Sequence, residues 1–171
     1  MTGGLERLNA LEPGEAKEAL LRCCGSKRWA EAMATRRPFS DSAALHRAAE
    51  EVGDALAREG WLEAFAAHPR IGDLSRLRER FGGSGEWSRR EQAGIASASE
   101  ETLEAIAQAN RLYEERFGHI FLVCATGKSA AEILSNLRDR LRNDPATEIR
   151  VAAREQRAIT RLRLERLLRE E

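Results

Sequence analysis

The chain has 171 residues, 42% of them hydrophobic, which is enough to bury the core of one globular domain without disulfides or metals. Its 28 basic residues balance 28 acidic ones, so it lacks the cationic block that is typical of proteins that bind nucleic acids or anionic membranes. The longest apolar run, Ile120 to Ala125, is too short to cross a bilayer. We therefore expect neither a nucleic-acid nor a membrane partner.

Apolar residues recur at three- and four-residue intervals through most of the chain. This spacing predicts an all-α fold, a single-domain bundle over residues 1–171 with about eight or nine helices. The clearest segments are Glu15 to Cys24, Trp29 to Thr35, Ala44 to Arg58, Thr102 to Phe117, Ser129 to Arg142 and Glu148 to Leu168. Prolines and glycines separate them, with three glycines among residues 82–85.

The cysteines indicate a reducing compartment. Cys23, Cys24 and Cys124 make an odd count without a C-x-x-C spacing, which suits free thiols better than disulfides or a zinc site. The first residues, Met1 to Gly4, lack the cationic and apolar regions of a secretory signal. We therefore expect a cytoplasmic location.

His68 stands where a helical pattern must stop. Proline at position 69 disfavours the helical conformation for the preceding residue, so the pattern through Trp61 and Phe65 is expected to end at His68. Imidazole titrates near neutral pH, and a histidine held on a stiff joint suits acid–base catalysis. The alternative is a structural role, in which the ring caps the free carbonyls of the helix end.

Glu91 follows the glycine-rich segment and ends a Ser-x-x-Glu sequence that begins at Ser88. This spacing is typical of a capping box, in which the two side chains satisfy the free amides of a first helical turn. The alternative is that the Glu91 carboxylate tunes a nearby proton carrier.

The run from Ile120 to Ala125 is either a buried strand or an irregular buried stretch. We favour the irregular stretch, because the sequence offers no second strand of similar quality to pair with it. Its amides would then need partners, and a polar ligand could supply them. Ser129 and Glu132 predict a capping box for the following helix. Thr126 to Ser129 also resembles the end of a phosphate-binding loop, but Leu122 stands where that motif needs glycine.

Arg163 lies on the apolar stripe of the last helical segment, with Ala152, Gln156 and Ile159. A guanidinium on that face needs an anion or a set of carbonyls, since leaving it unpaired would be costly. The partner is either an internal carboxylate or a substrate carboxylate.

Metal chemistry is not predicted. His46, His68 and His119 share no helical spacing with one another or with the cysteines, so we expect no metal site.

Five sequence motifs together resemble one family, the 2-oxo-4-hydroxy-4-carboxy-5-ureidoimidazoline (OHCU) decarboxylases. They lie in the same order along the chain, and the resemblance runs from about Leu5 to Leu168. The motifs are Arg37-Pro38-Phe39-Ser40, His68-Pro69-Arg70-Ile71-Gly72-Asp73, Ser88-x-x-Glu91-Gln92, Phe117 through Ala125, and Ile159-Thr160-Arg161-Leu162-Arg163-Leu164. The resemblance implies an all-α, cofactor-free, usually homodimeric enzyme of urate degradation, which converts OHCU to (S)-allantoin with loss of carbon dioxide.

The resemblance also implies roles for individual residues. His68 would be the catalytic acid and base. In the mechanism that we expect for this reaction, Glu91 would be a catalytic partner that holds the charge and orientation of the substrate ring. The substrate-binding set would be Pro69, Ser88, Arg89, Arg90, Glu91, Gln92, Phe121, Leu122, Val123, Cys124, Ala125 and Arg163. Two alternatives are a helical interaction module without catalysis and a related purine-ring hydrolase.

Overall fold

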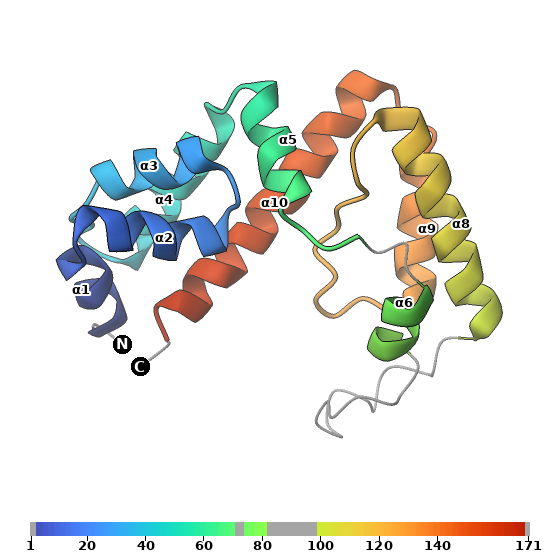
Figure 1. Ribbon diagram of the computed structural model, residues 1–171, viewed down its shortest axis with the longest axis horizontal. Helices are drawn as coiled ribbons and strands as arrows, with labels where there is room; N and C mark the ends of the chain where they lie inside the picture. Colours follow the sequence, from blue (N-terminus) through green and yellow to red (C-terminus); the bar gives the residue numbers. More distant parts are fainter. Residues whose placement is uncertain (1–2, 71–73, 82–98, 170–171) are drawn as a thin grey trace. The chain divides into compact units, whose positions relative to one another are not determined.

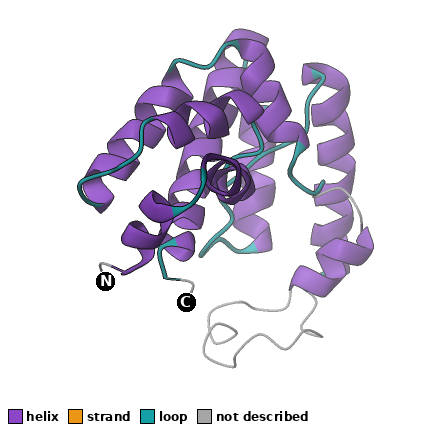
Figure 2. Cartoon of the chain, turned by 60° about the vertical axis from the view of Figure 1, so that its left-hand side comes forward, coloured by secondary structure: helices purple, strands orange, loops and turns teal. Residues whose placement is uncertain are grey.

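The computed structural model describes residues 3–70, 74–81 and 99–169 (Figure 1). Within these ranges the chain forms nine helices and no strand, which confirms the all-α prediction (Figure 2). The chain divides into two compact units, one of residues 1–68 and 153–171 and the other of residues 69–152.

The first unit contains five helices and most of a sixth. These are α1 (Gly3–Ala10), α2 (Pro13–Cys23), α3 (Lys27–Thr35), α4 (Ser42–Asp54), α5 (Arg58–Ala66) and the later part of α10 (Pro145–Leu167). The second unit contains α6 (Leu74–Phe81), α8 (Glu100–Phe117), α9 (Ala130–Arg140) and the start of α10.

Several of these helices are capped at their N-termini by a side chain that accepts a hydrogen bond from the first turn. Ser26 accepts a hydrogen bond from the amide of Trp29 at the start of α3, and Asp41 does the same for Ala44 in α4. The predicted capping box of Ser129 and Glu132 is present at the start of α9.

The observed helices differ from the predicted ones by more than two residues in three respects. The helix expected from Ala44 to Arg58 ends at Asp54, and α5 begins at Arg58. Helices α1 and α6 were not predicted, because eight residues carry only about two turns of periodic pattern. The last helix begins at Pro145 rather than Glu148, since proline is tolerated in a first turn.

The core of the first unit is built around Trp29, which is 1% exposed. Its neighbours in the core include Leu20, Met33 and Leu45, all completely buried. The indole nitrogen of Trp29 donates to the carbonyl of Ala49 at 3.1 Å, so the polar end of the ring is satisfied.

Two glycines of the first unit allow close backbone contact. A β-carbon at Gly4 would overlap the backbone of Leu168, so glycine lets α1 pack against the end of α10. A β-carbon at Gly25 would overlap the β-carbon of Ala67. Glycine at position 25 therefore brings the α2–α3 turn against the end of α5, one residue before His68.

The second unit is centred on Tyr113, whose side chain is completely buried. Helix α8 packs against α9, with Ile106, Ile133 and Leu137 buried in the same core. The ring of Tyr113 meets that of Phe121 edge to face, with centroids 5.3 Å apart. In the described ranges no helix is both long enough and apolar enough to span a membrane.

Candidate active site

His68 lies just beyond the end of α5. The helix ends at Ala66, and the amide of His68 donates to the carbonyl of Phe65 at 3.1 Å. The break at Pro69 was thus predicted to within two residues. The ring itself turns away from α5, because its Nε2 atom lies 2.8 Å from Oε1 of Gln156 and its Nδ1 atom 3.4 Å from Nη2 of Arg163, both on α10. These contacts do not support the capping role.

Gln156 and Arg163 determine which nitrogen of the His68 ring carries the proton. A guanidinium can only donate, so Nδ1 must accept from Arg163. The proton of the neutral ring then lies on Nε2, from which it is donated to the amide oxygen of Gln156. His68 is half-buried, and burial lowers its pKa below the usual value. The hydrogen bond that His68 donates to Gln156 raises this pKa, and the charge of Arg163 lowers it further. The ring is therefore neutral near pH 7, with Nδ1 free of a proton.

Arg163 has no carboxylate partner among the residues that the structure describes. Its Nη1 atom donates to the carbonyl of Arg22 at 3.3 Å, and its Nη2 atom faces His68. The side chain is half-buried. An internal ion pair, one of the two expected partners, is thus not present in the described part of the chain. The guanidinium retains donors for an oxygen of a ligand.

Behind His68 lies a series of hydrogen-bonded side chains that was not predicted from the sequence. The amide nitrogen of Gln156 donates to the hydroxyl of Thr160 at 3.1 Å, and Thr160 in turn contacts the thiol of Cys24. Gln156 and Thr160 are 6% and 5% exposed, and burial raises the pKa of the Cys24 thiol, which keeps it neutral. The one sequence signal for this role was that the amide of Gln156 lies on the same helical stripe as Arg163.

The stretch from Phe121 to Ala125 has no regular secondary structure and connects α8 to α9, as expected. Phe121, Leu122 and Val123 are at most 4% exposed, and Phe121 and Val123 belong to the core of the second unit. The carbonyl of Leu122 accepts from Arg140 at 2.6 Å, and that of Cys124 accepts from the ammonium of Lys128 at 2.8 Å. Any ligand of the three buried residues would therefore meet their main chain rather than their side chains.

A buried charged cluster supports this stretch. The carboxylate of Glu148 is completely buried, and it accepts hydrogen bonds from Arg140 at 2.7 Å, from Asn143 at 2.9 Å and from the hydroxyl of Tyr113. The guanidinium of Arg140 also lies 4.6 Å from the centroid of the Phe121 ring. Burial and the neighbouring carboxylate raise the pKa of Tyr113 far above its usual value, so its hydroxyl stays a donor. The cluster fixes the irregular stretch by contacts to both its backbone and a side chain.

The remaining predicted site residues fall into two groups. Pro69 is exposed and follows His68 directly. Ser88, Arg89, Arg90, Glu91 and Gln92 lie outside the described residues, so both roles considered for Glu91 stay predictions.

Lys128 lies in the segment Thr126 to Ser129, which resembles the end of a phosphate-binding loop, and its ammonium already has a hydrogen-bond partner. The ammonium of Lys128 donates to the carbonyl of Cys124, and Gly127 adopts a positive φ of 75° in the turn before α9. The capping interpretation of this segment is therefore confirmed. Across residues 3–70, 74–81 and 99–169, no group of three or more His, Cys, Asp or Glu side chains could hold a metal ion.

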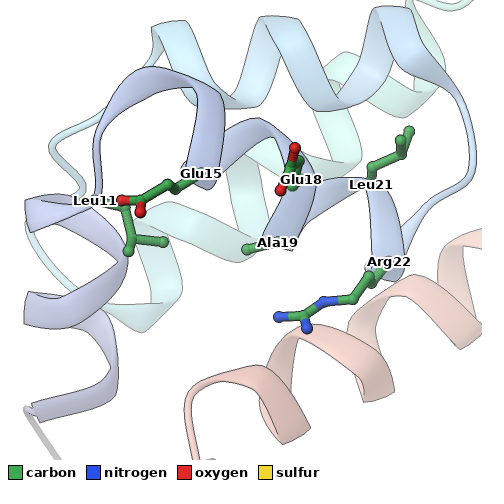
Figure 3. A pocket seen from close by; sticks show the side chains of 6 residues that line it. All are labelled: Leu11, Glu15, Glu18, Ala19, Leu21 and Arg22. Carbon is green, nitrogen blue, oxygen red and sulfur yellow. The ribbon is translucent and has the colours of Figure 1, made fainter.

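A hollow of about 610 Å³ lies along α2 in the first unit, the unit that also contains His68 (Figure 3). It is lined by Leu11, Glu15, Glu18, Ala19, Leu21 and Arg22. Figure 3 shows Arg22 reaching toward α10, and the carbonyl of this residue accepts from Arg163. The lining contains no histidine, so His68 remains the acid–base candidate.

Comparison with known proteins gives consistent matches. The family model of OHCU decarboxylase matches residues 9–165. The chain is 33% identical over 141 residues to 2-oxo-4-hydroxy-4-carboxy-5-ureidoimidazoline decarboxylase of Amia calva, covering 81% of this chain and 79% of that protein. It is 35% identical over 158 residues to uric acid degradation bifunctional protein TTL of Arabidopsis thaliana, covering 92% of this chain. It spans 48% of the length of that relative, and about a third of two bacterial bifunctional relatives.

A crystal structure of OHCU decarboxylase in the presence of (S)-allantoin matches with a TM-score of 0.72 and 35% identity, covering 90% of this chain and 99% of that one. The fold and the site define an all-α protein with a neutral imidazole facing a guanidinium. Because the family model matches most of its length, the chain belongs to the OHCU decarboxylase family.

Proposed function

We propose that the chain decarboxylates OHCU to (S)-allantoin, with His68 as the acid and base. The observation that carries this proposal is the position of Nδ1 of His68, unprotonated and 3.4 Å from a guanidinium that has no carboxylate partner among the described residues. The family match and the names of the relatives supply the substrate.

The substrate provides its own electron sink, so the reaction as we propose it needs no cofactor. The carbon that loses its carboxylate adjoins a C=N bond, which takes up the electron pair as carbon dioxide leaves. The resulting nitrogen anion takes one proton from solvent. The enol that remains then moves its hydroxyl proton to the neighbouring carbon, which gives the carbonyl and the new stereocentre of allantoin.

His68 would carry out that last proton transfer. Its neutral Nδ1 atom accepts the hydroxyl proton and returns it to one face of the ring carbon, which sets the handedness of the product. Arg163 would hold the same substrate oxygen, because a group bound at Nδ1 lies within reach of its guanidinium. A cation there stabilises the negative charge that develops on the oxygen as the proton leaves.

We also propose that the further residues named by the family resemblance contact the substrate. Glu91 would hold the charge and orientation of the ring, and the other contacts would come from Pro69, Ser88, Arg89, Arg90, Gln92, Phe121, Leu122, Val123, Cys124 and Ala125. Burial of the three side chains from Phe121 to Val123 supports main-chain contacts there.

We propose in addition that residues 1–171 act as one domain in a cytoplasmic homodimer without a nucleic-acid partner. The continuous helix α10, which contributes to both compact units, supports the single domain. Leu112 and Leu162, 51% and 41% exposed, are candidates for burial by a second copy. Sedimentation over a range of concentrations tests the dimer, and a single mass of one chain throughout would contradict it.

The test of the reaction uses OHCU generated freshly from urate by urate oxidase and hydroxyisourate hydrolase. The protein should speed the loss of the ultraviolet signal of OHCU and give circular dichroism of one sign. His68→Ala should lose about 100- to 10,000-fold in rate, the usual contribution of a positioned acid or base. His46→Asn is the control, because His46 lies on α4 and the charged groups that affect its pKa, Arg161, Glu165 and Glu50, are not among the predicted site residues.

Three outcomes would contradict the proposal. An unchanged rate in His68→Ala would remove the assignment of this residue. No acceleration by the parent protein would favour an interaction module. A ring-opened product without release of carbon dioxide would favour a hydrolase.

A further inference from the structure

The strongest unassigned feature is the amide of Gln156, which lies between His68 and the interior of the first unit. It is 6% exposed and makes two hydrogen bonds, one to Nε2 of His68 at 2.8 Å and one to the hydroxyl of Thr160 at 3.1 Å. A buried amide with both ends engaged is fixed in orientation.

The surrounding contacts determine which end of the amide faces the imidazole. Arg163 can only donate to Nδ1, so Nε2 carries the proton and needs an acceptor. The amide oxygen of Gln156 supplies it, and the amide nitrogen then faces Thr160. The hydroxyl of Thr160 accepts this bond while it contacts the thiol of Cys24. The contacts from Arg163 to His68, from His68 to Gln156 and from Gln156 to Thr160 thereby all run in one donor-to-acceptor direction.

We propose that Gln156 is a positioning residue, which holds His68 in the tautomer with Nε2 protonated and so presents an unprotonated Nδ1 to the substrate. This inference rests on the proposed function of His68 as the base. In the opposite tautomer the proton on Nδ1 would face the donors of Arg163, and the first proton transfer would have no acceptor.

A neutral amide suits this task better than a carboxylate. Glutamate at this position would also accept from Nε2, but its charge would stabilise the imidazolium and raise the pKa of His68. The ring would then be protonated over a wider pH range, and a protonated ring cannot begin the reaction as a base. Glutamine fixes the tautomer without adding that charge.

The direct test is ¹⁵N nuclear magnetic resonance of protein labelled in its three histidines, with the His68 signal assigned by its loss in His68→Ala. The nitrogen shifts of a neutral imidazole distinguish the two tautomers. In the parent protein Nε2 should carry the proton. In Gln156→Leu this preference should weaken, because only the 3.4 Å contact from Arg163 then favours it. The kcat should fall roughly 10- to 100-fold, as for other partners that orient a functional histidine, with a smaller change in KM.

Gln156→Glu provides a second measurement that is independent of whether the leucine variant folds. It should keep the proton on Nε2 and shift the acidic limb of the rate profile to higher pH. In the part of the chain that the structure describes, the charged group that faces the ring is Arg163, and the titratable Cys24 lies beyond Thr160. Gln108→Leu is the matched control, because Gln108 is exposed on α8 and should leave the tautomer and the rate unchanged.

The two proposals fail separately. A parent rate in His68→Ala would contradict the proposed function itself. Loss of activity in His68→Ala, together with an unchanged tautomer and rate in Gln156→Leu, would overturn the role of Gln156 alone. An unshifted acidic limb in Gln156→Glu would also count against it.

Discussion

The Nη2 atom of Arg163 lies 3.4 Å from Nδ1 of His68, so a permanent cation faces the nitrogen that the structure leaves without a proton. A cation at this distance disfavours protonation of the ring. The arrangement keeps His68 ready to accept a proton and places positive charge where a substrate oxygen would become negative.

Replacement of Arg163 by leucine tests this relationship. The pKa of His68 should rise, because one of the causes that lowers it is removed, so the acidic limb of kcat/KM should move to higher pH. KM for OHCU should increase. The melting temperature should stay the same or rise, because the cation that is lost is half-buried and, within residues 3–70, 74–81 and 99–169, pairs with no carboxylate.

Arg154→Leu is the control for that measurement, since Arg154 is exposed on the same helix. A large fall in the melting temperature of Arg163→Leu alone would indicate that the residue is chiefly structural. An acidic limb that does not move would contradict the electrostatic effect on His68.

The free energy of unfolding should depend on pH through His68 and His46. Burial lowers the pKa of both imidazoles in the folded state, whereas in the unfolded chain each titrates near its ordinary value of about 6.5. Below that value the unfolded state binds more protons than the folded state. The two histidines should therefore not reduce the free energy of unfolding above about pH 6.5. The free energy of unfolding should fall as the pH is lowered from there toward the folded-state pKa values.

Urea denaturation between pH 5 and 8 checks this dependence, in the parent protein and in His68→Asn and His46→Asn. Each substitution should flatten the slope below about pH 6.5, and the double variant should flatten it most. An equally steep slope in all four proteins would show that other groups are responsible.

The buried cluster of the second unit should respond strongly to loss of one partner. Arg140→Leu leaves the carboxylate of Glu148 buried without its cation, and we expect a loss of about 3–5 kcal/mol in the free energy of unfolding. Arg138→Leu, an exposed position on the same helix, should change stability by less than about 0.5 kcal/mol. Chemical denaturation measures both.

A double variant, Arg140→Leu with Glu148→Leu, should recover part of this loss, because no unpaired charge remains. If Arg140→Leu costs no more than the Arg138 control, the ion pair contributes nothing to the stability of the folded state.

Gly25 provides a test of how the end of α5 is positioned. A β-carbon at this residue would overlap Ala67, so Gly25→Ala should displace the turn that leads to His68 and reduce both stability and kcat. The second substitution Ala67→Gly removes the overlapping atom and should restore part of kcat. Gly14→Ala is the control, since a β-carbon there meets nothing within 4 Å. A normal rate in Gly25→Ala would contradict the close contact.

Local sequence patterns were sufficient for much of this protein. Apolar spacing predicted most of the helices, Pro69 predicted the break at His68, and Ser129 with Glu132 predicted a cap that the structure confirms. Each of these features depends on residues within about one or two helical turns of one another. Apolar spacing also predicted that the helix from Ala44 would extend to Arg58, whereas α4 ends at Asp54. The prediction was too long because the alanines and leucine after Asp54 continue the apolar pattern across the break.

The partners of His68 could be decided only by the tertiary structure. Gln156 and Arg163 are 88 and 95 residues away in the sequence, and no local periodicity relates α5 to α10 across such distances. The sequence by itself determined that the chain is helical and where an imidazole interrupts it. Packing of the first unit decided which nitrogen of that imidazole carries the proton, because the tautomer depends on the donor and the acceptor that folding brings to the ring.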